Sequence, residues 1–139
     1  MQTITPYLLY EDVPAAIDWL SRAFGFEERL RFADESGTVT HAELTLGEAE
    51  LFVGHPGPDF RSPKRLGAFT ALTHVYVDDV DAHCERARAA GATIHAEPAD
   101  QAYGDRRYDA EDPEGHRWSF AQVLRELEPE EWGATSPRA

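Results

Sequence analysis

Hydrophobic and polar residues alternate with two different periods along this chain, and the periods change at equivalent points in its two halves. Residues 4–10 and 71–77 are runs rich in β-branched, aromatic and leucine side chains, which is typical of strands. Each run precedes an Asp-Val pair, Asp12-Val13 or Asp79-Val80, that opens a segment of helical periodicity. The pattern predicts that each half begins with a strand followed by a helix.

Both predicted helices have recognisable start and stop residues. Asp12 caps the first helix, and Pro14 lies in its first turn, where the missing N–H costs nothing. Gly25 ends it, while the second helix runs from its cap Asp79 to Gly91. The predicted buried faces are Ala16, Ile17, Trp19, Leu20, Ala23 and Phe24 on the first helix, and Val80, Cys84 and Ala87 on the second.

Six further segments have the composition of strands, three after each helix. They cover residues 26–33, 38–46 and 49–53 in the first half, and 92–96, 107–110 and 117–123 in the second. The turn Asp112-Pro113-Glu114-Gly115 separates the last two, because Pro presets φ and Gly accepts a conformation that other residues avoid. The element order βαβββ is therefore predicted twice.

A segment rich in proline and glycine divides the two halves. We place the first module at residues 1–56, a linker or mobile loop at 57–69 and the second module at 70–124. Residues 125–139 form an acidic, proline-containing tail, which we expect to fray unless Trp132 docks on the body.

Composition and charge limit the classes of partner. Hydrophobic residues make up 42% of the chain and aromatic residues 11%, which favours a globular domain. The formal net charge of −13 argues against nucleic acid and anionic membranes as partners, since both require a basic surface. We interpret the charge first as an ordinary solvated surface, with attraction of a cationic ligand as the alternative.

Cys84 is the only cysteine, which rules out an intrachain disulfide and a C-x-x-C metal site. The first residues lack the basic and apolar regions of a signal peptide. No apolar run approaches the roughly 18 residues that a membrane-spanning helix needs. We therefore expect a cytoplasmic protein.

Four stretches in this order resemble the vicinal oxygen chelate superfamily, and most closely its PhnB-like branch. They are TPYLLYEDVPAAIDWLSRAFGFEE, HAELTLGEAELFV, VYVDDVDAHCERARAAGA and YGDRRYDAEDPEGHRW. The superfamily includes glyoxalase I, extradiol dioxygenases, fosfomycin-resistance enzymes and bleomycin-resistance binding proteins. The resemblance implies an α+β fold in which two tandem βαβββ modules form a curled mixed sheet around a cup-shaped cavity. It also implies a homodimer.

Metal-using members of the family place ligands at four positions, which correspond by motif to Thr5, Glu43, Leu72 and Ser119. Only Glu43 keeps a side chain that metals bind well, whereas a divalent ion takes three or four donors from His, Asp, Glu or Cys. We predict that the usual metal site is lost and that no cofactor is bound. This loss undermines glyoxalase and dioxygenase chemistry, since both need the ion.

Side chains two apart on a strand share a face, so the same resemblance predicts the remaining lining of the cup. Aromatic walls with a few convergent polar groups are typical of small-ligand pockets. The predicted ligand-binding residues are Thr5, Tyr7, His41, Glu43, His74, Tyr76, Arg117 and Ser119.

Three roles remain open for this cup. The leading hypothesis is metal-independent binding of a small, planar or cationic organic molecule, as in drug sequestration and antibiotic resistance. The alternative is a metal-dependent lyase, isomerase or dioxygenase that holds Zn, Ni, Mn or Fe on a displaced site of His41, Glu43 and His74. A structural role without ligand is the third. The sequence names neither the ligand nor any reaction, and the linker would permit a cup formed within one chain or by exchanged modules.

Two charged residues have competing interpretations. Glu43 beside His41 could act as a general base, but a structural ion pair with Arg117 is favoured. Arg106 could contact an anionic substrate, but a structural bridge to Asp109 or Asp112 is favoured.

Overall fold

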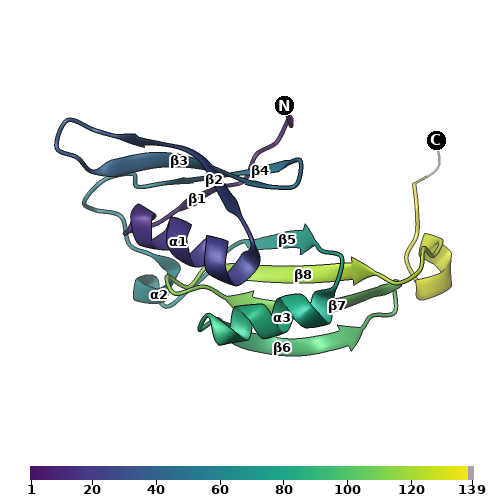
Figure 1. Cartoon of the computed structure of the whole chain (residues 1–139). Coiled ribbons are helices and arrows are strands. Elements are labelled where there is room, and N and C mark those ends of the chain that lie inside the picture. Colours follow the sequence, from purple (N-terminus) through teal and green to yellow (C-terminus); the bar gives the residue numbers. More distant parts are fainter. Residues whose placement is uncertain (138–139) are drawn as a thin grey trace.

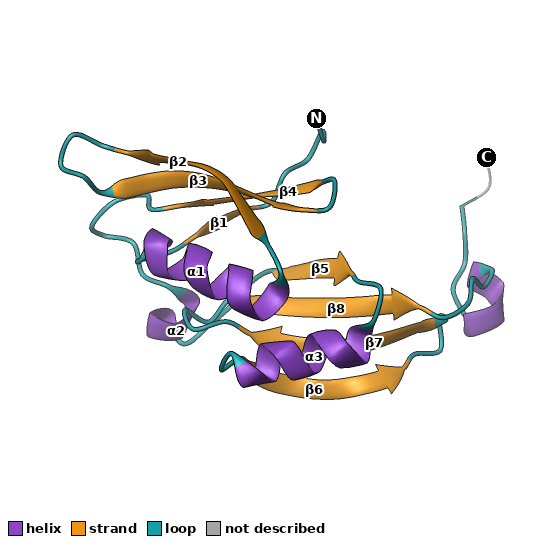
Figure 2. Ribbon diagram, in the orientation of Figure 1, coloured by secondary structure: helices purple, strands orange, loops and turns teal. Residues whose placement is uncertain are grey.

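The computed structural model describes residues 1–137, which form two βαβββ modules. This confirms the predicted α+β fold of two such modules (Figures 1 and 2). The first module contains β1 (Tyr7–Leu9), α1 (Val13–Phe24), β2 (Glu27–Ala33), β3 (Val39–Leu46) and β4 (Ala49–Gly54). The second contains β5 (Leu72–Tyr76), α3 (Val80–Ala89), β6 (Thr93–Asp100), β7 (Asp105–Glu111) and β8 (Arg117–Val123).

Each module has its own four-stranded mixed sheet. The strand orders are β1-β4-β3-β2 and β5-β8-β7-β6. In each sheet the strand before the helix pairs in parallel with the last strand of the module, and the other pairs are antiparallel. Within residues 1–137 the strands therefore form two separate open sheets rather than one continuous sheet.

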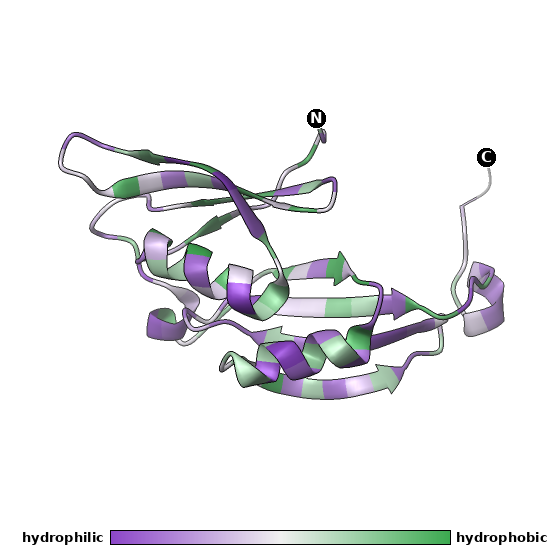
Figure 3. Ribbon diagram, in the orientation of Figure 1, coloured by the Kyte–Doolittle hydropathy of each residue, from purple (hydrophilic) through white to green (hydrophobic). Residues whose placement is uncertain are grey.

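The two modules meet through their helices. In Figure 1, α1 lies between its own sheet and the second module, next to α3. Phe24 at the end of α1 packs against Trp118 and Phe120 of β8, with ring centroids 5.1 and 4.5 Å apart. Burial of a side chain such as Phe24 contributes about 1.5–3 kcal/mol. The predicted apolar faces of both helices are buried, and hydropathy alternates along the strands (Figure 3).

Helix ends follow the capping residues in the sequence. The Asp12 carboxylate accepts the N–H of Ala15 at 3.0 Å, and Asp79 accepts that of Ala82 at 3.1 Å. Gly25 follows α1 with a φ of 86°, the left-handed conformation that favours glycine.

Polar contacts across the helix junction fix the modules relative to each other. The Arg86 guanidinium of α3 donates to the carbonyls of Arg22 and Ser21, at 2.8 and 2.9 Å, at the C-terminal end of α1. His83 lies between the Tyr108 hydroxyl, 2.6 Å from Nδ1, and the Phe24 carbonyl, 3.1 Å from Nε2. The Arg22 and Phe24 carbonyls lie in the last turn of α1, where a helix leaves carbonyls without intrahelical partners.

The linker is more ordered than the sequence indicated. Pro63–Leu66 forms a short helix, α2, whose cap Ser62 accepts the N–H of Arg65 at 3.3 Å. Arg65 also forms an ion pair with Glu11 at 2.5 Å. Hydrogen bonds from Ser62 and then Arg65 lower the pKa of Glu11 to about 2. The linker is thus attached to the start of α1.

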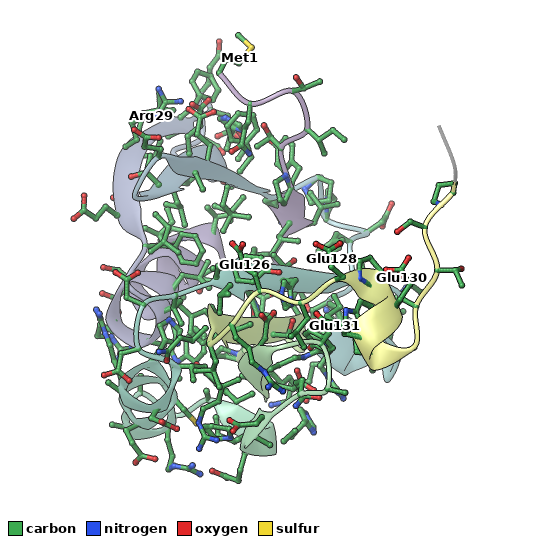
Figure 4. All side chains as sticks on the ribbon, turned by 90° about the vertical axis from the view of Figure 1, so that its right-hand side faces the viewer. Met1, Arg29, Glu126, Glu128, Glu130 and Glu131 are labelled. Atoms are coloured by element: carbon green, nitrogen blue, oxygen red, sulfur yellow. The ribbon has the colours of Figure 1, made fainter. Side chains whose placement is uncertain are left out.

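In the described part of the tail, residues 125–137, Pro129–Trp132 forms a short 3₁₀ helix, η1. Trp132 docks edge-on against Tyr103, with ring centroids 5.8 Å apart. The tail carries four glutamates in and just before η1: Glu126, Glu128, Glu130 and Glu131 (Figure 4). Among residues 1–137 no helix combines the length and apolar character needed to cross a membrane.

Candidate functional site

The faces of the two sheets that point away from the helices carry most of the predicted site residues. Ala42 and Leu44 of β3 are buried on the helix side, so His41 and Glu43 lie on the free face. Trp118 and Phe120 of β8 are buried likewise, so Arg117 and Ser119 lie on the free face of the second sheet. Strand alternation thus places side chains as the sequence predicted.

The first sheet brings Tyr7, His41 and Glu43 into one hydrogen-bonded chain. The Tyr7 hydroxyl lies 2.6 Å from His41 Nδ1, and His41 Nε2 lies 3.0 Å from the Glu43 carboxylate. Phe52 completes an aromatic cluster, with its ring edge-on to those of Tyr7 and His41 at 5.7 and 5.3 Å. Parallel pairing of β1 with β4 sets Tyr7 opposite Phe52.

Arg29 holds the Glu43 end of these hydrogen bonds, and the sequence did not identify Arg29 as a site residue. Its guanidinium pairs with Glu43 and lies 3.2 Å from the Glu50 carboxylate. The register of β2 shifts between Glu28 and Leu30, so Arg29 is the extra residue of a β-bulge on this strand. A strictly alternating strand would not indicate this position; a run of charged residues on an edge strand is the only sequence signal.

The expected pair between Glu43 and Arg117 is wrong within this chain. Arg117 lies on β8, 3.5 Å from Glu111 and 4.2 Å from the centre of the Phe69 ring. The error arose because strand parity identifies faces but not which sheets meet. Arg106 has a structural role as favoured, but with other partners: it bonds to Asp81 and Asp100.

The second sheet brings together His74, Tyr76 and Ser119. The Ser119 hydroxyl, which is fully buried, lies 2.5 Å from His74 Nδ1. The rings of His74 and Tyr76 meet edge-on at 5.0 Å. Burial, together with nearby Arg107, lowers the pKa of His74, so this imidazole favours its neutral form.

Within residues 1–137, no hydrogen bond or ion pair joins the first-sheet residues of the predicted site to those of the second sheet. A cleft of about 670 Å³ lies between the modules and has His74 and Tyr76 in its wall, opposite Glu50 and Leu51. Thr5 stands apart, 3.4 Å from the amide of Gln2. The predicted residues therefore form two groups in one chain rather than one cup.

The donors at the family's metal positions do not fit a metal ion. Leu72 offers only hydrocarbon, the Ser119 hydroxyl is engaged by His74, and the Glu43 carboxylate is shared by Arg29 and His41. In the described part of the chain, no three His, Cys, Asp or Glu side chains converge as a metal site requires. Metal-independence stays a prediction.

Comparison with known proteins identifies the family. The family model described as the glyoxalase/bleomycin resistance protein/dioxygenase superfamily matches residues 3–120. The uncharacterized protein Mb0911c of Mycobacterium bovis is 34% identical over 133 residues, which is 92% of this chain and 88% of that protein.

Solved structures agree with this assignment. TioX from Micromonospora sp. ML1 is 36% identical, with a TM-score of 0.73 over 89% of this chain and 100% of its own. A PhnB protein from Bacillus cereus is 18% identical, with a TM-score of 0.64 over 87% of this chain and 99% of its own, which indicates a shared fold. The resemblance seen in the sequence is confirmed, and the chain belongs to the glyoxalase/bleomycin resistance protein/dioxygenase superfamily.

Proposed function

We propose that this protein binds a small, planar or cationic organic molecule without a metal ion and sequesters it. The observation that carries the proposal is the aromatic cluster of Tyr7, His41 and Phe52, with carboxylates at its edge. Phe32 pairs with His41 across the strands and is 60% exposed, which extends the apolar surface. Such faces offer stacking surfaces to a flat ligand.

Charge favours a cationic ligand on this face. Glu43 and Glu50 share the single guanidinium of Arg29, so this cluster carries net negative charge. The whole chain has a formal charge of −13, which raises the local concentration of cations. A cation above Tyr7 or Phe52 would also gain a cation–π interaction.

A homodimer is part of the proposal, as is the cytoplasmic location expected from the sequence. The free face of the second sheet leaves Leu72 and Tyr76 exposed, as the first sheet leaves Phe32 exposed. Exposed apolar groups of this kind mark interaction surfaces. A cup would form if the first sheet of one chain faced the second sheet of its partner, which would bring the two groups of site residues together.

Thermal-shift measurements with chosen probes test ligand binding. Acridine orange and ethidium represent planar cations, and naphthalene sulfonate represents a planar anion. We expect the cations to stabilise the protein in proportion to their concentration, and Glu43→Gln to weaken their binding about tenfold. Glu97→Gln, which alters an exposed carboxylate paired with Arg88, is the matched control and should change nothing.

Two outcomes would contradict this function. One is an absence of stabilisation by any of the three probes at millimolar concentrations. The other is stoichiometric Zn, Ni, Mn or Fe in protein purified without chelator that is lost in the double variant His41→Ala, His74→Ala. The second result would favour the metal-dependent enzyme, with His74 supplied by the partner's second sheet. Analytical ultracentrifugation of the same samples reports whether the protein is a dimer.

A further inference from the structure

We propose that Tyr7, His41 and Glu43 form a hydrogen-bonded relay that activates the phenol oxygen of Tyr7. This oxygen would accept a hydrogen bond or a proton from a ring N–H or O–H of the bound molecule. That a molecule binds here rests on the proposed function, whereas the relay itself does not. The inference narrows the ligand class to planar rings that carry an acidic N–H or O–H.

The partners of each group fix the direction of the hydrogen bonds. Arg29 holds Glu43 as a carboxylate, which can only accept, so His41 Nε2 donates to it across 3.0 Å. In a neutral imidazole the other nitrogen then carries a lone pair. His41 Nδ1 therefore accepts, and the Tyr7 hydroxyl 2.6 Å away is its donor.

This arrangement matches that of an activated nucleophile in an enzyme. A hydroxyl lies beside a histidine base, and a carboxylate orients the base and stabilises the cation that forms when the base takes a proton. When a ligand gives its proton to the Tyr7 oxygen, the Tyr7 proton moves to His41 Nδ1. The products are the ligand's conjugate base and an imidazolium beside Glu43, so protons and charge balance without another reactant.

Gly54 makes room for the phenol. It lies opposite His41 in the register of β3 and β4. A Cβ at this position would lie 2.8 Å from Cε1 and 2.9 Å from the hydroxyl oxygen of Tyr7, closer than such atoms approach. The glycine thus allows the Tyr7 ring to cross the strand and reach His41, an arrangement that a larger residue would prevent.

The same chain offers a matched control in Tyr76. Tyr7 is 49% exposed and Tyr76 is 60% exposed, so both are open to a reagent. Tyr76 also lies beside a histidine, but His74 Nδ1 is engaged by Ser119. Within residues 1–137 the Tyr76 hydroxyl is not bonded to a histidine, so of these two exposed tyrosines only Tyr7 is expected to carry an activated phenol.

Labelling with benzenesulfonyl fluoride tests the relay. The Tyr7 oxygen forms a bond to sulfur, the S–F bond breaks, fluoride leaves and the phenol proton passes to His41. The reagent is neutral, so the acidic surface does not concentrate it. We expect peptide mass spectrometry of chelator-treated protein to find Tyr7 modified at least about tenfold faster than Tyr76, in line with general-base assistance.

Variants separate the relay from simple exposure. His41→Gln and Glu43→Gln should reduce the rate at Tyr7 to that at Tyr76, while His95→Gln, on an exposed site of the second sheet, should leave the ratio unchanged. Tyr76 in each sample calibrates the reagent, because its rate should not change, and the circular dichroism spectrum reports whether the variant is folded. Nitrogen-15 NMR should find His41 as the Nε2–H tautomer, with that preference lost in Glu43→Gln.

Equal rates at Tyr7 and Tyr76 in the unmodified protein would overturn the relay, as would an excess at Tyr7 that survives both substitutions. Neither result depends on a ligand. Failure of the dye-binding experiment together with selective Tyr7 labelling would refute the proposed function and leave the relay. Dye binding without selective labelling of Tyr7 would refute the relay and leave the proposed function.

Discussion

The Tyr10 hydroxyl donates a 2.7 Å hydrogen bond to the Asp112 carboxylate, which joins the end of the first module's first strand to the closing turn of the second. The same carboxylate accepts the indole N–H of Trp118 at 3.1 Å and the backbone N–H groups of Glu114 and His116. Both Tyr10 and Asp112 are buried. A residue that the sequence marks as part of a turn is therefore also a contact between modules.

Asp112→Asn should destabilise the protein, because the amide removes the charge that strengthens these bonds and turns one acceptor into a donor. Loss of a hydrogen bond to a charged group costs about 1.5–3 kcal/mol, and several are affected here. Urea unfolding at pH 7 measures the change. Asp109→Asn breaks only a partly exposed ion pair with Arg107 and should cost at most about 1 kcal/mol. Equal losses in the two variants would show that Asp112 is an ordinary turn residue.

Tyr10 makes stability sensitive to alkaline pH. Burial, and then the charge of Asp112, raise the pKa of Tyr10 well above its ordinary value. Because the folded-state pKa is raised, this contribution is complete below about pH 10, where the unfolded phenol titrates, and is lost as the pH rises further. Burial also raises the pKa of Tyr108, so Tyr108 adds to the same loss of stability at alkaline pH. Urea unfolding between pH 8 and 11 should give a shallower decline for Tyr10→Phe than for the unmodified protein; identical slopes would contradict this.

His83 makes stability sensitive to mildly acidic pH. Burial lowers the pKa of His83; Arg86 acts the same way, and the bond to the Phe24 carbonyl opposes the change. The unfolded chain therefore takes up a proton near the ordinary histidine pKa before the folded chain does, and stability falls as the pH drops below about 6.5.

His83→Gln should flatten this decline between pH 7 and 5, because glutamine has no proton to gain. The lowered pKa of His74 acts in the same range and should leave a residual slope in the variant. His95→Gln, on an exposed histidine, is the control. The lowered pKa of Glu11 acts below about pH 4.5 and so falls outside this window. If the stability of His83→Gln falls as steeply between pH 7 and 5 as that of the unmodified protein, His83 does not have this role.

The fold follows closely from local signals in the sequence. β8 has the predicted bounds of 117–123, since a proline-glycine turn and an apolar run define it. The helix caps at Asp12 and Asp79 are confirmed, because each Asp directly precedes a segment of helical periodicity and accepts an N–H of the first turn. The first strand is shorter than predicted, and α2 was not predicted, because the Ser62-Pro63 helix start lies in a segment that otherwise reads as a loop.

The site was predictable only where strand geometry decides it. The period of two places His41 and Glu43 together, and the register opposes His74 to Ser119. Arg29 could not be predicted, because a β-bulge turns it onto the free face. Long-range packing decides whether the two faces meet, and no local pattern encodes it.

Gly54→Ala should disconnect the relay without altering any of its members. Gly54 does not have a positive φ, so alanine suits its backbone, but the new Cβ would collide with the Tyr7 ring. The ring is a side chain and can turn away, whereas the Thr40 carbonyl oxygen, 3.0 Å from the new Cβ, must shift slightly. We therefore expect a folded protein that loses on the order of 1 kcal/mol of stability. Sulfonyl fluoride labelling of Tyr7 should fall to the rate at Tyr76.

A second glycine separates this steric effect from the general cost of replacing glycine. Gly57 has open space where a Cβ would lie but a φ of 137°, so Gly57→Ala tests backbone strain alone and should leave the labelling of Tyr7 unchanged. If Gly54→Ala retains fast labelling of Tyr7 in a folded protein, the contact between the phenol and His41 does not activate Tyr7. If both variants lose it equally, a general loosening of the first module explains the result better than the position of the Tyr7 ring.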